Sequence, residues 1–289
     1  MTINPATLAT VDALPVETTL RAARDHGRAI LVPYVTGGVT ADWTDYLLAY
    51  QEAGADAIEI GLPFSDPMLD GATIQRASDQ ALARGTTVAG ILADLAAVRG
   101  RVRVPLIAMT YANLVVRAGA RAFCELLAGA GIRGLIVPDV PVDELGEFAQ
   151  AAEAAGVEMI LLVAPSTEPG RLREICDRSR GFVYAVSVMG TTGERDTLAD
   201  TAAALAAAVR AVSDRPVLIG FGVSSAAHAV QAARMADGAV MASSLMRKVL
   251  DGATPAEVGR DLAAVRRELD RERDGDEPAT GIEVPHDRG

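Results

Sequence analysis

Eight short runs of apolar, largely β-branched residues recur along this chain, and each is followed by turn residues and then by an alanine-rich amphipathic segment. Strands with such near-continuous hydrophobicity are typical of a parallel sheet that is covered on both faces. Eight strands alternating with helices predict an α/β protein with the closed (β/α)8 TIM barrel, because eight strands are the number that closes it. The runs begin near Ile30, Ala57, Val104, Gly134, Glu158, Phe182, Pro216 and Gly238.

An open, doubly wound sheet is the alternative arrangement of the same elements. Its dinucleotide-binding form would usually carry a G-x-G-x-x-G turn after the first strand. The first run here, ILVPYVT, is followed by Gly37-Gly38-Val39 and lacks that turn. We therefore predict the barrel.

The chain is predicted to be one folded domain with two different ends. No Pro/Gly/Ser-rich linker divides it, so residues 17–265 are assigned to the barrel. Residues 1–16 are predicted to be a loose lead-in or an extra N-terminal helix that acts as a lid. Residues 266–289 are charged and poor in apolar side chains, which predicts a frayed helix followed by a disordered tail.

Composition excludes several classes of protein. The net charge of −11 argues against a nucleic-acid-binding protein, which needs a basic face. No apolar run is long enough to span a membrane, and the N-terminal stretch lacks a basic region followed by an apolar one, so we expect a cytoplasmic protein. Cys124 and Cys176 fall in helix-like segments and are expected to be small core residues, not a disulfide.

Small residues follow three of the predicted strands, at the end where a barrel of this kind binds its ligands. Gly193, Gly222 and Ser243 fall where backbone N–H groups can approach a ligand closely. Loops after strands seven and eight that lead into helix N-termini are the usual phosphate site of this fold. The alternative is that these residues only make tight turns. The G-T-T-G segment, Gly190–Gly193, is also expected to be a flexible lid.

One carboxylate stands inside the second run, between two isoleucines. Burying an ionised carboxylate is costly unless it is paired, and no basic residue in that run offers Glu59 a partner. Glu59 is therefore either a general acid/base whose pKa is raised by an apolar setting, or it is turned outward or neutralised by a distant arginine. Asp70, at the start of the next predicted helix, is either a second functional carboxylate or an ordinary N-cap.

The lysine and histidine content disfavours two common routes to carbon–carbon bond cleavage. Lys248 is the single lysine and lies in the helix after the eighth strand, so no lysine is placed to form a Schiff base. His26, His228 and His286 are scattered among helices and tail, so we expect no metal site. Proton transfer must then be carried out by carboxylates and tyrosines.

The run from Glu59 to Gln75, EIGLPFSDPMLDGATIQ, closely resembles the signature of the tryptophan synthase alpha chain family. Its S-D-P-x-x-D-G element is highly specific, and the resemblance extends from about Thr19 to Leu250. Further matching segments are VPYVT from Val32, YANL from Tyr111, PDVPVDE from Pro138, APS from Ala164 and GFGVSS from Gly220.

The resemblance implies a lyase that cleaves indole-3-glycerol phosphate by a retro-aldol reaction into indole and glyceraldehyde 3-phosphate, in the last steps of L-tryptophan biosynthesis. It implies no cofactor in this chain, because pyridoxal phosphate is expected only in the partner, a tryptophan synthase beta chain, within an alpha2-beta2 assembly. Two other functions stay open: a stand-alone lyase that releases free indole, and a catalytically silent allosteric partner of a beta-type enzyme. The presence of both Glu59 and Asp70 speaks against the silent partner.

The resemblance also implies roles for individual residues. Glu59 is the principal acid/base and protonates C3 of the indole ring, while Asp70 stabilises the indole N–H as positive charge builds there. Ala242 stands where the family usually has a glycine, and Leu69, the Gly37–Val39 turn and the Gly190–Gly193 loop also depart from the usual residues. The pocket would be lined by Tyr34, Met109, Tyr111, Tyr184 and Thr192, and the phosphate would be held by Gly193, Gly222, Ala242 and Ser243. The partner interface would include Asp66, Pro67 and the segment from Asp139 to Glu144.

Overall fold

A computed structural model describes residues 14–186, 195–220 and 222–274. Within these residues the eight predicted runs all form strands, although the fifth run is divided in two. The strands are β1 (Ile30–Thr36), β2 (Ile58–Gly61), β3 (Leu106–Met109), β4 (Ile132–Ile136), β5 (Glu158–Met159), β6 (Leu161–Val163), β7 (Val183–Val186), β8 (Val217–Gly220) and β9 (Gly238–Met241).

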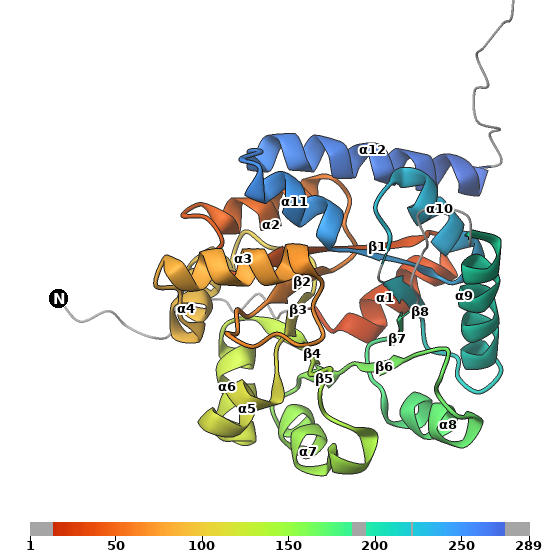
Figure 1. Cartoon of the computed structure of the whole chain (residues 1–289), viewed down its shortest axis with the longest axis horizontal. Helices are drawn as coiled ribbons and strands as arrows, with labels where there is room; N and C mark the ends of the chain where they lie inside the picture. Colours follow the sequence, from red (N-terminus) through yellow and green to blue (C-terminus); the bar gives the residue numbers. More distant parts are fainter. Residues whose placement is uncertain (1–13, 187–194, 221, 275–289) are drawn as a thin grey trace, which may run out of the picture.

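The strands form one parallel sheet in the order β5-β4-β3-β2-β1-β9-β8-β7-β6. Its two outermost strands, β5 and β6, are consecutive pieces of one segment that is interrupted at Ile160. Because β5 pairs with β4 and β6 pairs with β7, this single segment joins both ends of the sheet (Figure 1). The sheet is therefore closed, which confirms the predicted barrel and excludes the open sheet.

Helices cover the outside of the barrel (Figure 1). No single helix in the described part of the chain is long and apolar enough to cross a membrane, and α3 and α4 meet the length and composition test only as a pair bent by 91°. The helices are α1 (Val16–Asp25), α2 (Trp43–Glu52), α3 (Ala72–Ala83), α4 (Val88–Val98), α5 (Ala112–Ala118), α6 (Ala120–Gly129), α7 (Gly146–Ala154), α8 (Pro169–Arg178), α9 (Arg195–Arg210), α10 (Ala226–Met235), α11 (Ser243–Leu250) and α12 (Pro255–Asp274).

Helix α1 packs against the interior of the barrel. Its buried residues Val16 and Leu20 belong to the same apolar cluster as Ile30, Phe182 and Leu218, which lie on or beside the strands. Because α1 precedes β1, it meets the strands at their amino ends, opposite the end where a barrel of this kind binds ligands. Residues 1–13 lie outside the described residues, so the predicted lead-in stays a prediction.

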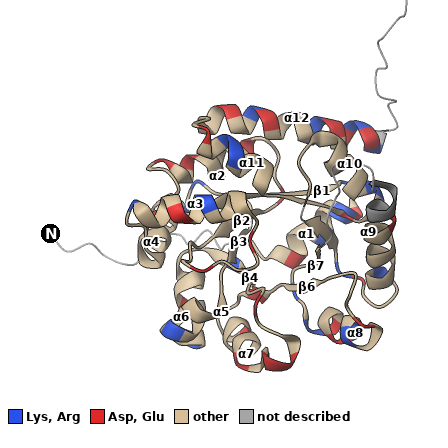
Figure 2. Cartoon of the chain, in the orientation of Figure 1, with Lys and Arg blue, Asp and Glu red and all other residues tan. Residues whose placement is uncertain are grey.

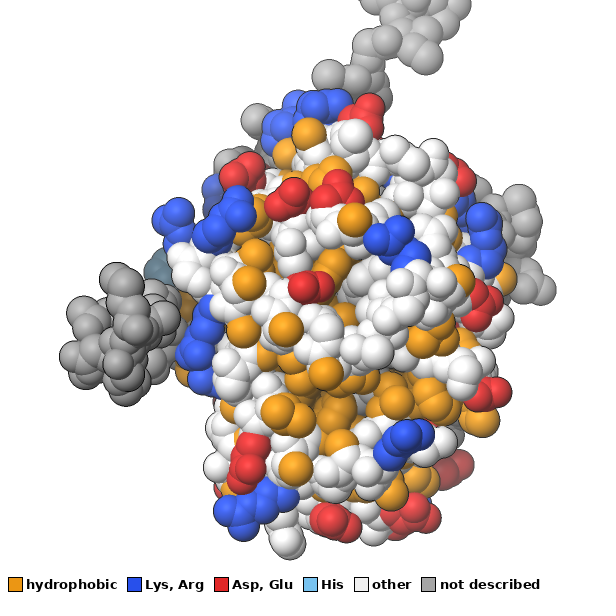
Figure 3. Space-filling model, turned by 90° about the vertical axis from the view of Figure 1, so that its left-hand side faces the viewer, with side chains coloured by type: hydrophobic (Ala, Val, Ile, Leu, Met, Phe, Trp, Pro, Cys, Tyr) orange, Lys and Arg blue, Asp and Glu red, His pale blue; other side chains and the backbone are white. Residues whose placement is uncertain are grey.

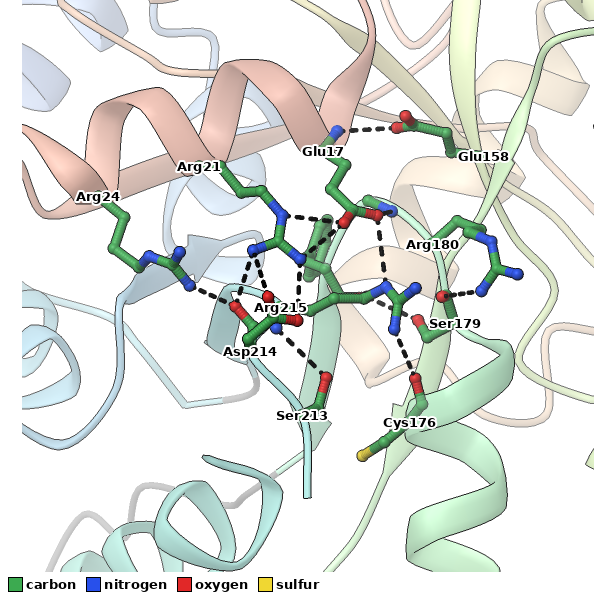
Figure 4. A network of polar contacts seen from close by, with 12 residues as sticks. Glu17, Arg21, Arg24, Glu158, Cys176, Ser179, Arg180, Ser213, Asp214 and Arg215 are labelled. Carbon is green, nitrogen blue, oxygen red and sulfur yellow. Dashed lines mark hydrogen bonds and ion pairs between the residues drawn. The ribbon is translucent and has the colours of Figure 1, made fainter. Parts of the chain in front are cut away.

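Polar contacts tie α1 to the barrel (Figure 4). The Glu158 carboxylate on β5 accepts a hydrogen bond of 2.9 Å from the backbone N–H of Glu17, in the first turn of α1, where Pro15 at the N-cap offers no side-chain acceptor. The Glu17 carboxylate in turn accepts from Arg21 Nε at 2.9 Å and from Arg215 Nε at 3.3 Å. Glu158 therefore supplies the cap that the helix itself lacks.

Helix α12 continues past residue 265, where the barrel was predicted to end, as far as Asp274. Leu269 extends the buried stripe of α12. Arg266 is only 6% exposed, and its guanidinium forms an ion pair of 3.1 Å with Asp56 that offsets the cost of burying its charge. The outer side of α12 carries interspersed acidic and basic residues (Figure 2). The first nine residues of the predicted tail are thus helical, while residues 275–289 lie outside the described residues.

Candidate active site

A cavity of about 300 Å³ opens at the carboxyl ends of the strands. It brings together residues from β1, β2, β3, β7 and β9 with the loops that follow β2, β8 and β9. Residues predicted for the site that line the cavity are Tyr34, Glu59, Asp70, Met109, Tyr184, Gly222, Ala242 and Ser243. Thr192 and Gly193, with the predicted G-T-T-G lid, lie outside the described residues.

Seven further residues line the cavity that the sequence reasoning missed. Ile74 and Arg247 lie one turn into the helices that begin beside Asp70 and Ser243, so the helical repeat of about 3.6 residues was the signal that could have found them. The full set is Gly71, Ile74, Val223, Ser224, Val240, Ser244 and Arg247.

Two glycines make room for the tyrosines of the cavity. A Cβ added at Gly61, at the end of β2, would lie 1.8 Å from the hydroxyl oxygen of Tyr34. A Cβ added at Gly220, at the end of β8, would lie 2.0 Å from a ring carbon of Tyr184. Both rings are buried, and burial raises the pKa of each phenol well above its ordinary value, so both stay neutral. The rings thus lie over strand ends that only glycine can occupy.

Glu59 is 1% exposed, and its side chain lines the cavity rather than turning outward. Its Oε2 atom has no hydrogen-bond partner, and within the described residues no arginine or lysine pairs with it. Burial raises the pKa of Glu59 to about 8, and the nearby charge of Asp70 adds to the rise. At neutral pH the carboxyl group is therefore protonated and able to donate a proton.

Asp70 is not the N-cap of α3, because Gly71 holds that position and no side chain caps the helix. Burial raises the pKa of Asp70 to about 6, and a hydrogen bond from Tyr111 opposes part of that rise. The Tyr111 hydroxyl also accepts a hydrogen bond of 3.1 Å from the Leu69 N–H, and its ring stacks on Phe64 with centroids 5.4 Å apart. Tyr111 is not among the residues that line this cavity, and its hydroxyl contacts the loop that carries Asp70.

The other end of the cavity is formed by the starts of α10 and α11. Gly222, with φ of +84°, adopts a conformation that favours glycine, and Ser225 caps α10 by accepting from the His228 N–H. Ala242 is the N-cap of α11 with φ of −117° and ψ of −77°. That conformation does not require the glycine that is usual in the resembling family. Two helix N-termini, whose free N–H groups favour anions, therefore meet at this end.

The residues predicted for a partner interface lie in two loops, the one after β2 that also carries Asp70 and the one after β4. Asp66 is exposed and accepts a hydrogen bond from Ser65, whereas Pro67 is buried. The Asp139 carboxylate accepts from the N–H of Ala112 at 2.9 Å, which caps the start of α5. Three exposed apolar side chains accompany them in the same loop and on α5: Met68, 79% exposed, Leu69, and Val116, 65% exposed.

Figure 3 faces the side on which α3, α4 and α6 lie in Figure 1, and it shows hydrophobic side chains gathered in the middle and lower part of that face.

In the described residues, no group of histidine, cysteine, aspartate and glutamate side chains could hold a metal ion. Cys124 and Cys176 are both buried and free, as predicted.

The family model described as tryptophan synthase alpha chain matches residues 20–272. The tryptophan synthase alpha chain of Chloroflexus aggregans is 41% identical over 254 residues, which cover 87% of this chain and 95% of that one. The one from Gloeobacter violaceus is 43% identical over 244 residues, covering 82% and 87%. Among solved structures, tryptophan synthase from M. tuberculosis in its aminoacrylate-bound form is 36% identical with a TM-score of 0.79, covering 88% of this chain and 98% of that one. Tryptophan synthase subunit alpha from Legionella pneumophila is 28% identical with a TM-score of 0.81, covering 89% and 98%.

Proposed function

The chain belongs to the tryptophan synthase alpha chain family, and on that premise we propose how its carboxylates carry out the lyase reaction. The reaction cleaves indole-3-glycerol phosphate into indole and glyceraldehyde 3-phosphate. The observation that carries the proposal is Glu59, a buried carboxyl group without a partner for Oε2, in the cavity at the carboxyl end of the barrel. A purely structural carboxylate at such a position would be paired.

Glu59 begins the reaction in its protonated form. It donates its proton to C3 of the indole ring, which converts the ring into an indoleninium cation. The bond between C3 and the glycerol side chain then breaks, and its electron pair returns to the ring and restores indole. The glycerol hydroxyl loses its proton to the Glu59 carboxylate as the aldehyde forms. Glu59 thus ends the cycle protonated, as it began.

Asp70 stabilises the positive charge that appears at the indole nitrogen in the intermediate. Its pKa of about 6 keeps it ionised at neutral pH, whereas Glu59, with a pKa of about 8, stays protonated. Two carboxylates whose environments separate their pKa values in this way can divide acid and charge-stabilising roles between them. Tyr34, Met109 and Tyr184 enclose the substrate, and Tyr111 acts through Asp70.

The phosphate binds at the opposite end of the cavity, beside Gly222, Ala242 and Ser243, where α10 and α11 begin. Thr192 and Gly193 keep their predicted contacts with the substrate and its phosphate as part of the proposal. No cofactor is needed in this chain, because the protonated indole ring accepts the electrons of the breaking bond. We also propose a cytoplasmic location.

The isolated chain should release indole from indole-3-glycerol phosphate with a bell-shaped pH dependence of kcat/KM. The rate should fall below about pH 6, where Asp70 becomes protonated, and above about pH 8, where Glu59 loses the proton that it must donate. Indole release measured against pH tests this. A rate that keeps rising above pH 8 would contradict the role of Glu59 as proton donor, and no indole release at any pH would refute the proposed function.

The partner is a tryptophan synthase beta chain that holds pyridoxal phosphate and receives the indole, in an alpha2-beta2 assembly. This proposal is supported by the exposed apolar side chains of Met68, Leu69 and Val116, which lie in the same loop as Asp66 and on the helix capped by Asp139. Exposed apolar residues clustered beside a site are typical of interaction surfaces.

Addition of a purified beta chain should raise the rate of indole-3-glycerol phosphate cleavage severalfold. Met68→Asp should weaken this activation, because it places a charge in an apolar interface, while leaving the rate of the isolated chain unchanged. Leu82→Asp, at the far end of α3, is the matched control and should be activated like the wild type. Cleavage rates with increasing beta chain test this, and no activation of the wild type would favour a stand-alone lyase.

A further inference from the structure

The charges that line the cavity do not balance the charge of its substrate. Glu59 and Asp70 are acidic, and among the described lining residues Arg247 is the one cation. A phosphate monoester carries a charge of about −1.5 to −2 at neutral pH. The dipole of each helix is equivalent to about +0.5 elementary charge at its N-terminus, so α10 and α11 together offer about +1 elementary charge. A side-chain cation would supply the remaining charge.

Arg247 is placed to supply it. It follows Ser243 by four residues on α11, so both lie on the same face of the helix, one turn apart. Side chains of a helix lean towards its N-terminus, which directs Arg247 back over the turn that begins with Ser243. Arg247 is exposed and lines the cavity alongside Ser224 and Ser244.

The guanidinium of Arg247 also forms neither an ion pair nor a hydrogen bond within the described part of the chain. Its neighbour Lys248, by contrast, pairs with Asp261 and ties α11 to α12. The serine hydroxyls near Arg247 are held in place: Ser224 Oγ lies 3.1 Å from His228 Nδ1, and Ser244 Oγ donates to the Val223 carbonyl at 3.5 Å. Of the two adjacent cations, only Arg247 is available to a ligand.

We propose that Arg247 binds the substrate phosphate through its guanidinium group and thereby selects a phosphorylated substrate. This rests on the proposed function, because it concerns the phosphate end of the same cavity. A guanidinium can form two parallel hydrogen bonds to one phosphate, which backbone N–H groups from different loops do not duplicate. Arg247 is a binding residue and takes no part in the proton transfers.

Arg247→Gln should weaken the binding of glycerol 3-phosphate by about tenfold or more at low ionic strength, because a charge-assisted contact is lost. The binding of indole, which has no phosphate, should not change. Arg247→Lys should restore part of the affinity, since it keeps the charge but not the planar fork. The matched control is Lys248→Gln, which removes the same charge from the same helix and should leave both affinities at the wild-type value. Calorimetric titrations of the full chain with each ligand measure these values.

Unchanged affinity of Arg247→Gln for glycerol 3-phosphate would overturn the assignment, and so would an equal loss of affinity for indole, because that would indicate a general disturbance of the cavity. A wild-type chain that shows no affinity for glycerol 3-phosphate would overturn it too. Failure of the proposed function is distinguishable from these results, because it would appear as a wild-type chain that binds glycerol 3-phosphate but releases no indole from indole-3-glycerol phosphate.

Discussion

Replacing Glu59 by glutamine should lower the rate of indole release by about a thousandfold or more, because the amide keeps the shape of the side chain but cannot exchange the proton that both steps need. Glu59 lines the cavity, is 1% exposed and has no partner for Oε2. The loss should appear in kcat, measured at saturating indole-3-glycerol phosphate. If Glu59→Gln turned over at a rate close to that of the wild type, the proposed mechanism would be wrong.

The same substitution should make the protein more stable at high pH, which separates loss of chemistry from loss of fold. The pKa of Glu59 is raised by the fold, so its contribution to stability is fully present below the ordinary pKa of 4.5 and is lost as the pH rises through about 8. Glutamine stays neutral throughout. The unfolding free energy of Glu59→Gln should therefore match that of the wild type near pH 4, exceed it increasingly between about pH 4.5 and pH 8, and stay higher by up to roughly 5 kcal/mol above pH 8.

Glu158→Gln is the matched control for this experiment. Glu158 is, like Glu59, a glutamate on a strand whose pKa is raised by burial, but it is only half-buried and lies at the opposite end of the barrel, where it caps α1. Its replacement should weaken that cap, by about 1 kcal/mol of unfolding free energy, and leave kcat at the wild-type value. A large fall in kcat would show that such substitutions act through the fold.

The barrel was predictable because its signal is repeated and redundant. Each strand is a separate apolar run, so an error in the bounds of one run leaves the number of predicted strands unchanged. The interruption at Ile160, which produces nine strands instead of eight, was not predictable, because Glu158–Val163 reads as one continuous apolar run. What divides it is the pairing with two different neighbours, β4 and β7, and this is a property of the closed sheet.

The course of α12 illustrates a different limit. Beyond residue 265, Leu269 is the one large apolar residue before the end of the helix, so the local composition indicated a frayed end. Arg266 is nevertheless buried because Asp56, more than 200 residues earlier in the chain, accepts its guanidinium, and Ala29 accepts a second hydrogen bond at 2.8 Å. An ion pair between distant segments cannot be inferred from a local window of sequence.

Within the site, the carboxylates could be identified from the sequence, but the fit around them could not. A glutamate between isoleucines is conspicuous, because it breaks an apolar run. The need for glycine at Gly61 and Gly220 depends on where the rings of Tyr34 and Tyr184 lie. That Asp70 is not the N-cap of a helix follows only from the start of α3 at Ala72, which makes Gly71 the N-cap. These features arise from contacts between different strands and loops.

Replacing Asp70 by asparagine should lower kcat by about a hundredfold, because the amide oxygen can still accept the indole N–H but no longer offers the charge that stabilises the cation. Glu59→Gln removes the proton itself and should have the larger effect. Asp66→Asn, four residues earlier in the same loop and exposed, is the matched control and should leave the isolated chain at the wild-type rate.

The pH dependence makes the Asp70→Asn experiment decisive, because the two carboxylates interact. The charge of Asp70 is the second cause of the raised pKa of Glu59, after burial. Without that charge the acid limb near pH 6 should disappear, and the alkaline limb should move from about pH 8 to lower pH, since Glu59 then loses its proton more readily. A profile that keeps both limbs in place would mean that Asp70 does not act on the reacting centre, and the division of roles between the two carboxylates would then be wrong.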